Sequence, residues 1–175
     1  MNYAMSARAQ AEPNIEVHKF YGGAITVVAF LALVLQAFLN KYGAWAGFVE
    51  LPLLVTIYFG LSRRNPATGL LLGTTIGVLQ DAVSHAPIGL YGLAKTCVGY
   101  VASSIGARID TEHPLARAAL VFLFFHLHQI VLTAIERVLL GHPAPFFNSK
   151  LLIAALVNAG VALVLFPVLD RLRKP

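Results

Sequence analysis

The sequence predicts an all-α membrane protein, a bundle of six transmembrane helices with both termini in the cytoplasm. Three observations predict this fold. Hydrophobic residues make up 58% of the 175-residue chain and charged residues only 12%, whereas about a quarter of a soluble domain is charged. Six apolar stretches each have about the length that crosses a bilayer. The basic residues gather in alternate connections between these stretches, as membrane topology requires.

The first element is a polar N-terminal segment, residues 1–19, which is predicted to be a cytoplasmic tail. The membrane domain is predicted to occupy the remainder, residues 20–175, and its first helix residues 20–40. This apolar stretch is about twice the length of a signal-peptide core, and a polar segment precedes it. We therefore expect a retained transmembrane helix and not a cleaved signal.

The second helix is predicted over residues 44–61, with Glu50 and Pro52 in its first two turns, where proline is tolerated. The stretch Arg63-Arg64-Asn65-Pro66 follows and combines charge with a helix-stopping proline. Because a proline restrains the residue before it to extended conformations, the helix should end before Pro66.

The third helix, residues 67–83, carries Gly69, Gly73 and Gly77 at four-residue spacing. Glycine weakens a helix in water, so three at this spacing require a reason. In a bilayer, small residues on one helix face allow a neighbouring helix to approach closely. The spacing thus predicts a tightly packed helix pair, and Asp81 lies one further step along.

The remaining helices are predicted over residues 88–107, 115–140 and 149–169. A tight break at residues 84–89 separates the third helix from the fourth, and Gly141-His142-Pro143 follows the fifth. The single cysteine, Cys97, lies inside the fourth helix, where we expect a small packing residue. One cysteine excludes an intrachain disulfide and a cysteine metal site.

The distribution of lysine and arginine predicts the orientation. On the predicted cytoplasmic side lie Arg8, Lys19, Arg63, Arg64, Arg108, Arg117, Arg171, Arg173 and Lys174, whereas only Lys41 and Lys150 lie on the other side. Because positively charged connections stay in the cytoplasm, both termini should be cytoplasmic. The net charge of +5 thus reflects topology, and nothing in the pattern indicates nucleic-acid binding.

Five charged residues are predicted within the outer half of the membrane: Glu50, Asp81, Lys95, Glu136 and Arg137. A charge inside a bilayer is costly, so these groups should pair or face a cavity. Three interpretations follow. Asp81 and Lys95 pair across the hairpin of the third and fourth helices, or the charges line an outward-facing pocket for a small ligand, or residues near helix ends extend to the headgroups.

The fifth helix carries a second polar stripe, His126, Gln129, Thr133 and Arg137, which should face the bundle because these residues share about a third of the helix circumference. His126 and His128 point about 200° apart on a helix and so do not suit one metal ion. No nucleophile motif, phosphate-binding loop or zinc-binding motif is present. We therefore expect no enzyme activity, no metal and no cofactor.

In the hairpin of the third and fourth helices, the stretch Gly77-Val78-Leu79-Gln80-Asp81-Ala82-Val83-Ser84 is followed by Pro87-Ile88-Gly89-Leu90. This hairpin resembles the bacterial rod shape-determining protein MreD family. The family pattern is a glycine-rich helix ending in Gly-x-x-x-Asp, a loop with Pro-Leu-Gly, and an aliphatic helix. His85 stands where this pattern has glycine, and Ile88 replaces leucine.

The resemblance implies a non-enzymatic inner-membrane subunit of the cell-elongation machinery. Its implied partners are an MreC-like single-pass membrane protein, the peptidoglycan synthase formed by RodA and a class B transpeptidase, and, indirectly, the MreB filament. Asp81, Pro87 and Gly89 are the family-like residues of the hairpin. The small-residue faces should pack inside the bundle, leaving a lipid-facing surface for a partner helix.

The MreD family is also similar in fold to the substrate-binding S-components of energy-coupling factor transporters, which hold a small ligand in an outward-facing pocket. The charges predicted in the outer half of the bundle would suit such a pocket. A likeness of fold does not establish a function. Two hypotheses therefore stand: a structural assembly subunit and a ligand-capture subunit.

Overall fold

The computed structural model describes residues 20, 22–39, 41, 46–109, 113–141 and 148–173. The predicted N-terminal tail, residues 1–19, lies outside these residues. Within the described ranges the chain is helical, and strand pairing is limited to an isolated bridge between Phe20 and Arg173. The elements are α2 (Gly22–Leu39), a 3₁₀ turn η1 (Ala46–Phe48), α3 (Leu51–Arg63), α4 (Pro66–Ser84), α5 (Leu90–Gly106), α6 (Pro114–Leu139) and α7 (Ser149–Asp170).

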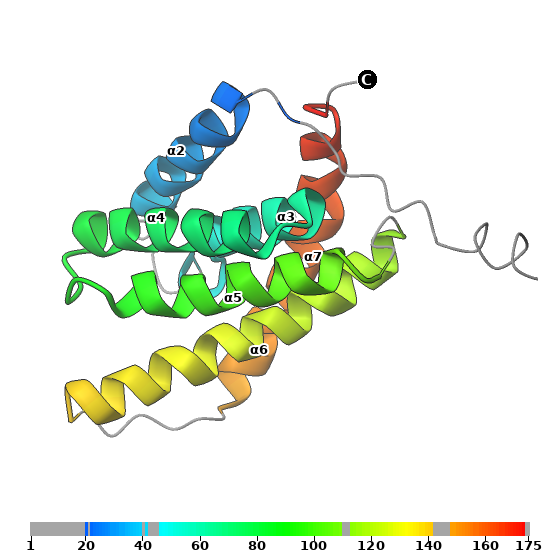
Figure 1. Ribbon diagram of the computed structural model, residues 1–175. Helices are drawn as coiled ribbons and strands as arrows, with labels where there is room; N and C mark the ends of the chain where they lie inside the picture. Colours follow the sequence, from blue (N-terminus) through cyan, green and yellow to red (C-terminus); the bar gives the residue numbers. More distant parts are fainter. Residues whose placement is uncertain are drawn as a thin grey trace, which may run out of the picture.

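Successive helices run in alternating directions, so that the starts of α2, α4 and α6 lie at the same end of the bundle as the ends of α3, α5 and α7 (Figure 1). The bridge between Phe20 and Arg173 joins the start of α2 to the end of α7. At the same end, Gly106 of α5 packs on the backbone of Leu61 in α3.

Five of the six predicted helices agree with the structure to within two residues at each end, and the second helix does not. It was expected from residue 44 with Glu50 inside it, but α3 begins only at Leu51, and Glu50 precedes it in a non-helical conformation (φ −124°). The reason is Pro52, which stands at the beginning of the helix. A proline lacks a backbone donor and clashes with the preceding turn of a helix, so it is accommodated in the first turn, and the helix that contains Pro52 starts at Leu51.

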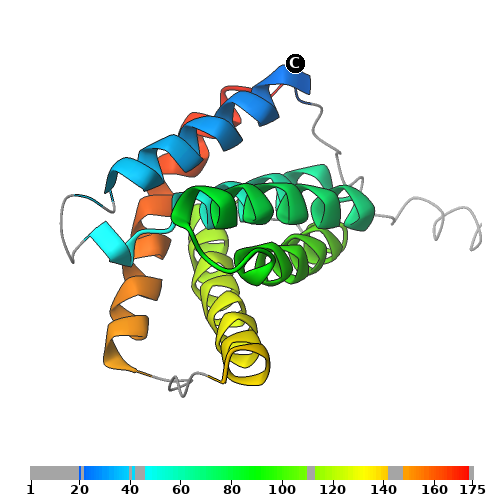
Figure 2. The same ribbon diagram turned by 90° about the vertical axis from the view of Figure 1, so that its left-hand side faces the viewer.

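The α4–α5 hairpin is the tightest helix pair, and its two helices lie side by side in both views (Figures 1 and 2). A Cβ atom on Gly69, Gly73 or Gly77 would collide with α5: at Gly73 with the carbonyl of Lys95, and at Gly77 with that of Tyr91. Gly99 of α5 makes the reciprocal approach to Gly69. The small-residue face predicted from the glycine spacing therefore packs directly on the α5 backbone.

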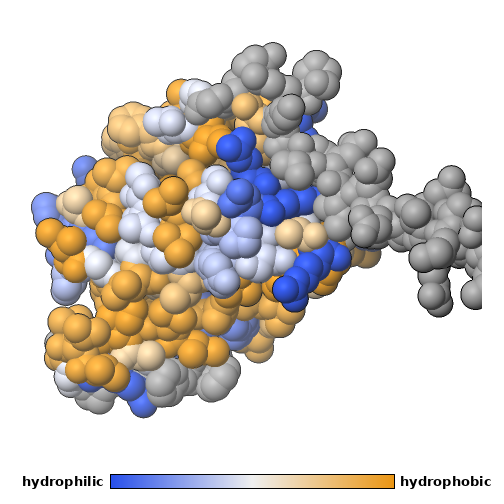
Figure 3. All heavy atoms as spheres, in the orientation of Figure 1, coloured by the Kyte–Doolittle hydropathy of each residue, from blue (hydrophilic) through white to orange (hydrophobic). Residues whose placement is uncertain are grey.

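Helix α3 forms the centre of the bundle, and its residues from Pro52 to Ser62 are all buried. The outer helices are different, because many large apolar side chains of α2, α6 and α7 are exposed. Hydrophobic residues cover the front of α6 in Figure 3, and hydrophilic residues gather toward the ends of the bundle. Cys97, which was expected to pack inside, is exposed, because it lies on the same face of α5 as the exposed Leu93 and Tyr100.

Two of the described helices, Pro114–Leu139 and Ser149–Asp170, are long and apolar enough by themselves to cross a membrane. Gly23–Leu39 and Leu51–Arg63 are shorter apolar helices. Helices α4 and α5 carry more glycine and polar residues, and they bury these against one another and against α3.

Candidate functional site

The candidate site is a cluster of buried polar side chains where α3, α4, α5 and α6 meet near one end of the bundle. It is built around Glu50, Asp81, Lys95 and His128, of which the last three are 0% exposed. Helix α4 contributes Asp81 in its last turn, and α5 contributes Lys95 one and a half turns from its start. Glu50 precedes α3, and His128 lies near the middle of α6.

Asp81 caps helix α5. Its Oδ2 accepts hydrogen bonds from the backbone N–H groups of Gly89 (2.8 Å) and Gly92 (3.1 Å). Its Oδ1 accepts a hydrogen bond from the N–H of Tyr91 (2.8 Å). The first N–H groups of a helix lack partners within the helix, and a carboxylate there also meets the positive end of the helix dipole. Asp81 thus fixes the start of α5 on the end of α4.

The loop geometry that permits this cap depends on two residues with positive φ. His85 ends α4 in the left-handed conformation (φ 54°), and Gly89 precedes α5 with φ 100°. The second value is readily adopted only by glycine. The loop also contains the predicted Pro87, whose carbonyl accepts a hydrogen bond from the N–H of Leu90 (3.1 Å). The family-like residues of the hairpin therefore shape the turn.

The expected pair of Asp81 and Lys95 is wrong, because the Lys95 ammonium binds the Glu50 carboxylate. Lys95 Nζ lies 2.9 Å from Glu50 Oε1, and Gln80 Nε2 donates to the same oxygen at 2.8 Å. The Lys95 side chain is 0% exposed and the Glu50 side chain 15%. Asp81 is satisfied by backbone donors, and Glu50 comes within reach because α3 starts late.

Two aromatic rings complete the surroundings of the ammonium group. Lys95 Nζ lies 4.7 Å from the centroid of the Tyr91 ring, a cation–π contact, and 3.4 Å from His128 Nε2. Tyr91 and His128 stack with their centroids 6.1 Å apart and their planes 12° apart. Because an ammonium group only donates, His128 Nε2 is the acceptor and Nδ1 carries the proton. His128 Nδ1 has no hydrogen-bond partner among the described residues.

Two amides from other helices hold the backbone around Glu50. Asn158 of α7 accepts a hydrogen bond from the Glu50 N–H (2.9 Å) and donates one to the Phe48 carbonyl (2.6 Å). Gln36 of α2 donates to the Val49 carbonyl (3.0 Å) and accepts from the Leu51 N–H (2.9 Å). This segment has irregular backbone, and the amides supply the partners that lipid would not. Glu50 is therefore positioned by α2, α4, α5 and α7 together.

The other predicted site residues lie outside this cluster. Glu136 is half-buried and Arg137 exposed near the end of α6. In the predicted polar stripe, Thr133 is buried, whereas His126 is half-buried and uses Nδ1 to contact the carbonyl of Phe122 at 2.9 Å. The stripe expected to face the bundle does so only in part.

Sequence reasoning missed five polar residues that complete the cluster: Gln36, Gln80, Tyr91, His128 and Asn158. His128 was detectable, because helical spacing places it on one face with Val121, Phe124, Phe125 and Leu132, all buried. Gln36 and Asn158 had no comparable signal, since their partners are backbone groups of a distant, irregular segment.

A second polar cluster fixes the opposite end of the bundle. Asp170 at the end of α7 binds Arg117 of α6 (2.6 Å) and Arg173 (2.7 Å) through its two carboxylate oxygens. It also accepts a hydrogen bond from the Tyr58 hydroxyl of α3 (2.9 Å). This cluster ties α3, α6 and α7 together where the basic residues gather.

Neither cluster has the composition of a metal centre: the described residues contain no group of three histidine, cysteine, aspartate or glutamate side chains placed to hold an ion. The arrangement joins helices, with an acid capping a helix and an ion pair bridging α3 and α5. Within the described residues the chain is helical, much of its surface is apolar and the buried charges are paired, a combination typical of integral membrane proteins.

The family model of the rod shape-determining protein MreD matches residues 18–174, and the chain belongs to this family. The resemblance seen in the hairpin is thereby confirmed over nearly the whole chain. Membership gives the protein a role in rod-shape determination at a membrane. Comparison with curated proteins and with solved structures found no match.

Proposed function

We propose that this protein is a non-catalytic subunit of the cell-elongation complex in the bacterial inner membrane. It would act as a scaffold that links an MreC-like single-pass membrane protein to the peptidoglycan synthase of RodA and a class B transpeptidase, with the MreB filament reached indirectly. One observation supports this most: Glu50, Asp81 and Lys95 are each bound by groups of the protein itself. Such charges stabilise a bundle and are not free to act on a substrate.

We propose further that the chain crosses the membrane six times with both termini in the cytoplasm. The described arginines at one end of the bundle support this orientation: Arg63, Arg64, Arg108, Arg117, Arg171 and Arg173. At the other end lie Lys41, Arg137 and Lys150. Cys97 gives a test of membrane exposure, because it is a single, exposed thiol. Maleimides react with the thiolate, which forms only in contact with water, so a maleimide should label Cys97 in denaturing detergent and not in intact vesicles.

The partner's transmembrane helix requires a lipid-facing surface with room for close approach, and α7 offers one. A shallow apolar groove runs along Val157, Gly160, Val161, Val164, Leu165 and Val168. A Cβ on Gly160 would meet nothing within 4 Å, so this glycine serves no packing within the described part of the chain. Glycine inside a helix costs about 0.5–1 kcal/mol relative to alanine. Close contact with another helix would offset that cost.

The glycines offer matched variants for the experiment. In Gly160→Leu the new side chain projects outward, so the protein should fold normally but lose its partner helix. In Gly69→Leu the new side chain meets Ser103 and the carbonyl of Gly99 on α5, so the bundle itself should fail. The two substitutions are chemically identical and differ only in where the glycine lies.

The test is copurification of the tagged protein from membranes in mild detergent, with partners identified by mass spectrometry. The wild type should retain the MreC-like protein and the synthase, and Gly160→Leu should lose the MreC-like protein while remaining monodisperse. Recovery of no elongation component with the wild type would refute the scaffold function. Recovery of the energising subunits of a transporter would instead establish the S-component function.

A further inference from the structure

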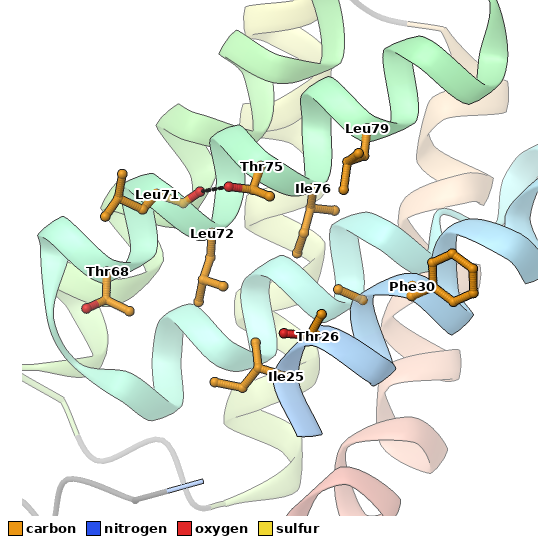
Figure 4. A pocket seen from close by; sticks show the side chains of 10 residues that line it. Ile25, Thr26, Phe30, Thr68, Leu71, Leu72, Thr75, Ile76 and Leu79 are labelled. Atoms are coloured by element: carbon orange, nitrogen blue, oxygen red, sulfur yellow. Dashed lines mark hydrogen bonds between the residues drawn. The ribbon is translucent and has the colours of Figure 1, made fainter. Parts of the chain in front are cut away.

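The seam between α2 and α4 contains two successive cavities, of which the second has the more polar lining. The first, of about 310 Å³, is almost wholly apolar and is lined by residues 25–30 of α2 and 68–79 of α4. Figure 4 shows Ile25 and Phe30 on one wall and Leu71, Leu72 and Leu79 on the other. The second cavity, of about 430 Å³, continues toward the ends of the same helices and is lined by residues 33–41 and 80–85.

The second cavity has a mixed lining, in which basic and amide side chains stand beside Leu33, Ala37 and Val83. Lys41 and His85 lie on its wall with Gln36, Gln80 and Ser84. No aspartate or glutamate is among its described lining residues. A hydrogen bond from Gln80 links the cavity wall to the carboxylate of Glu50, and Lys95 neutralises that carboxylate. An anion in this cavity would meet a lysine without a competing acidic side chain.

Gln80 adds an unsatisfied acceptor. Its Nε2 donates to Glu50, which fixes the orientation of the amide, and its Oε1 has no hydrogen-bond partner among the described residues. The residue is 7% exposed. This oxygen is itself buried, and a buried acceptor without a partner costs about 1–3 kcal/mol.

His85 occupies a position that favours a different residue. It ends α4 with φ 54°, a conformation for which glycine is the usual choice and which costs other residues about 1 kcal/mol. A histidine here therefore destabilises the turn relative to glycine. Its side chain lines the second cavity, which supplies a reason for its presence.

We infer that the α2–α4 seam binds one anionic phospholipid, with the phosphate beside Lys41 and His85 and an acyl chain in the apolar cavity. Seventeen residues separate Thr68 from His85 on α4, about 25 Å of helix at 1.5 Å per residue. A lipid tail spans half of a hydrocarbon core of about 30 Å, so headgroup and tail fit along this length. This inference rests on the proposed topology, which places Lys41 and His85 at the outer headgroups.

The test measures binding of phosphatidylglycerol and phosphatidylcholine to the purified full-length chain in detergent, by native mass spectrometry across a lipid titration. The wild type should bind phosphatidylglycerol several-fold more tightly. Lys41→Ser should weaken that binding about fivefold, the size expected for one basic residue near an anionic headgroup. Lys150→Ser is the matched control, because Lys150 is an exposed lysine at the same end on α7 and should leave affinity unchanged.

His85→Gly separates binding from folding. Glycine suits the backbone, so thermal stability should hold or rise while phosphatidylglycerol binding weakens. Ala29→Phe, which fills the apolar cavity, should weaken binding of both lipids. Equal affinity for the two lipids, or equal losses in Lys41→Ser and Lys150→Ser, would overturn the inference. Competition by millimolar glycerol phosphate would show an anion site without a tail. Failure to copurify elongation components leaves these lipid measurements unaffected.

Discussion

Replacing Lys95 by methionine should strongly destabilise the bundle, because it removes the basic side chain that binds the largely buried carboxylate of Glu50. Glu50 would keep its hydrogen bond from Gln80 (2.8 Å) but lose the ammonium at 2.9 Å. Methionine has nearly the same length as lysine, so the packing around Tyr91 and His128 is kept. The effect then reports the uncompensated charge and not a cavity.

The magnitude follows from the burial of the pair. The Lys95 side chain is 0% exposed and that of Glu50 is 15% exposed, so solvent screens the pair only weakly. Breaking a buried ion pair by removing one partner costs about 3–5 kcal/mol. Replacing both partners removes the charge problem, and Glu50→Gln with Lys95→Met should return to within about 1 kcal/mol of the wild type.

The assay is equilibrium unfolding of the purified protein from mild detergent into sodium dodecyl sulfate, followed by circular dichroism. The wild type, Lys95→Met, Glu50→Gln and the double variant form a double-mutant cycle. The double variant should be about 2–4 kcal/mol more stable than either single variant. Effects that add to within about 0.5 kcal/mol would show that the two residues are energetically independent and would refute the reasoning.

Three further predictions use the same unfolding assay. Asp81→Asn keeps the shape of the cap but removes its charge and one acceptor, so stability should fall by about 2–3 kcal/mol; an unchanged midpoint would mean that the charge and the lost acceptor contribute nothing net. Asn158→Ala removes the partners of the Glu50 N–H and the Phe48 carbonyl and should cost about 1–3 kcal/mol, with the exposed Leu156→Ala as control. Arg64→Gly relieves a left-handed residue (φ 54°) and should raise stability by about 0.5–1 kcal/mol, and a loss would show that the arginine side chain stabilises the end of α3.

The sequence predicted the helices and the glycine seam because both follow from local rules. Apolar length and proline stops place helix ends to within a turn. Glycines four residues apart lie on one helix face, and they therefore pack against the next helix of the hairpin. Pro52 is the exception. The predicted second helix begins well before this proline, whereas Pro52 stands in the first turn of α3.

The partners of the buried charges were less predictable, because they depend on how several helices meet. Asp81 and Lys95 lie close in sequence, which favoured pairing them, but the N–H groups at the start of α5 are nearer to Asp81. Lys95 then reaches Glu50, which is 45 residues earlier in the chain. The error in the start of α3 concealed this partner, since Glu50 inside a helix would have pointed elsewhere.

The most direct test of the account asks whether the buried ion pair is structural. A rod-shaped bacterium lacking its own MreD protein would be complemented with the wild type, Lys95→Met, or the double variant Glu50→Gln with Lys95→Met, and cell shape scored at equal membrane abundance. A scaffold needs the fold and not the charges, so the double variant should restore rods. Round cells despite normal folding and abundance of the double variant would contradict the account, because Glu50 and Lys95 would then act on a ligand or a proton.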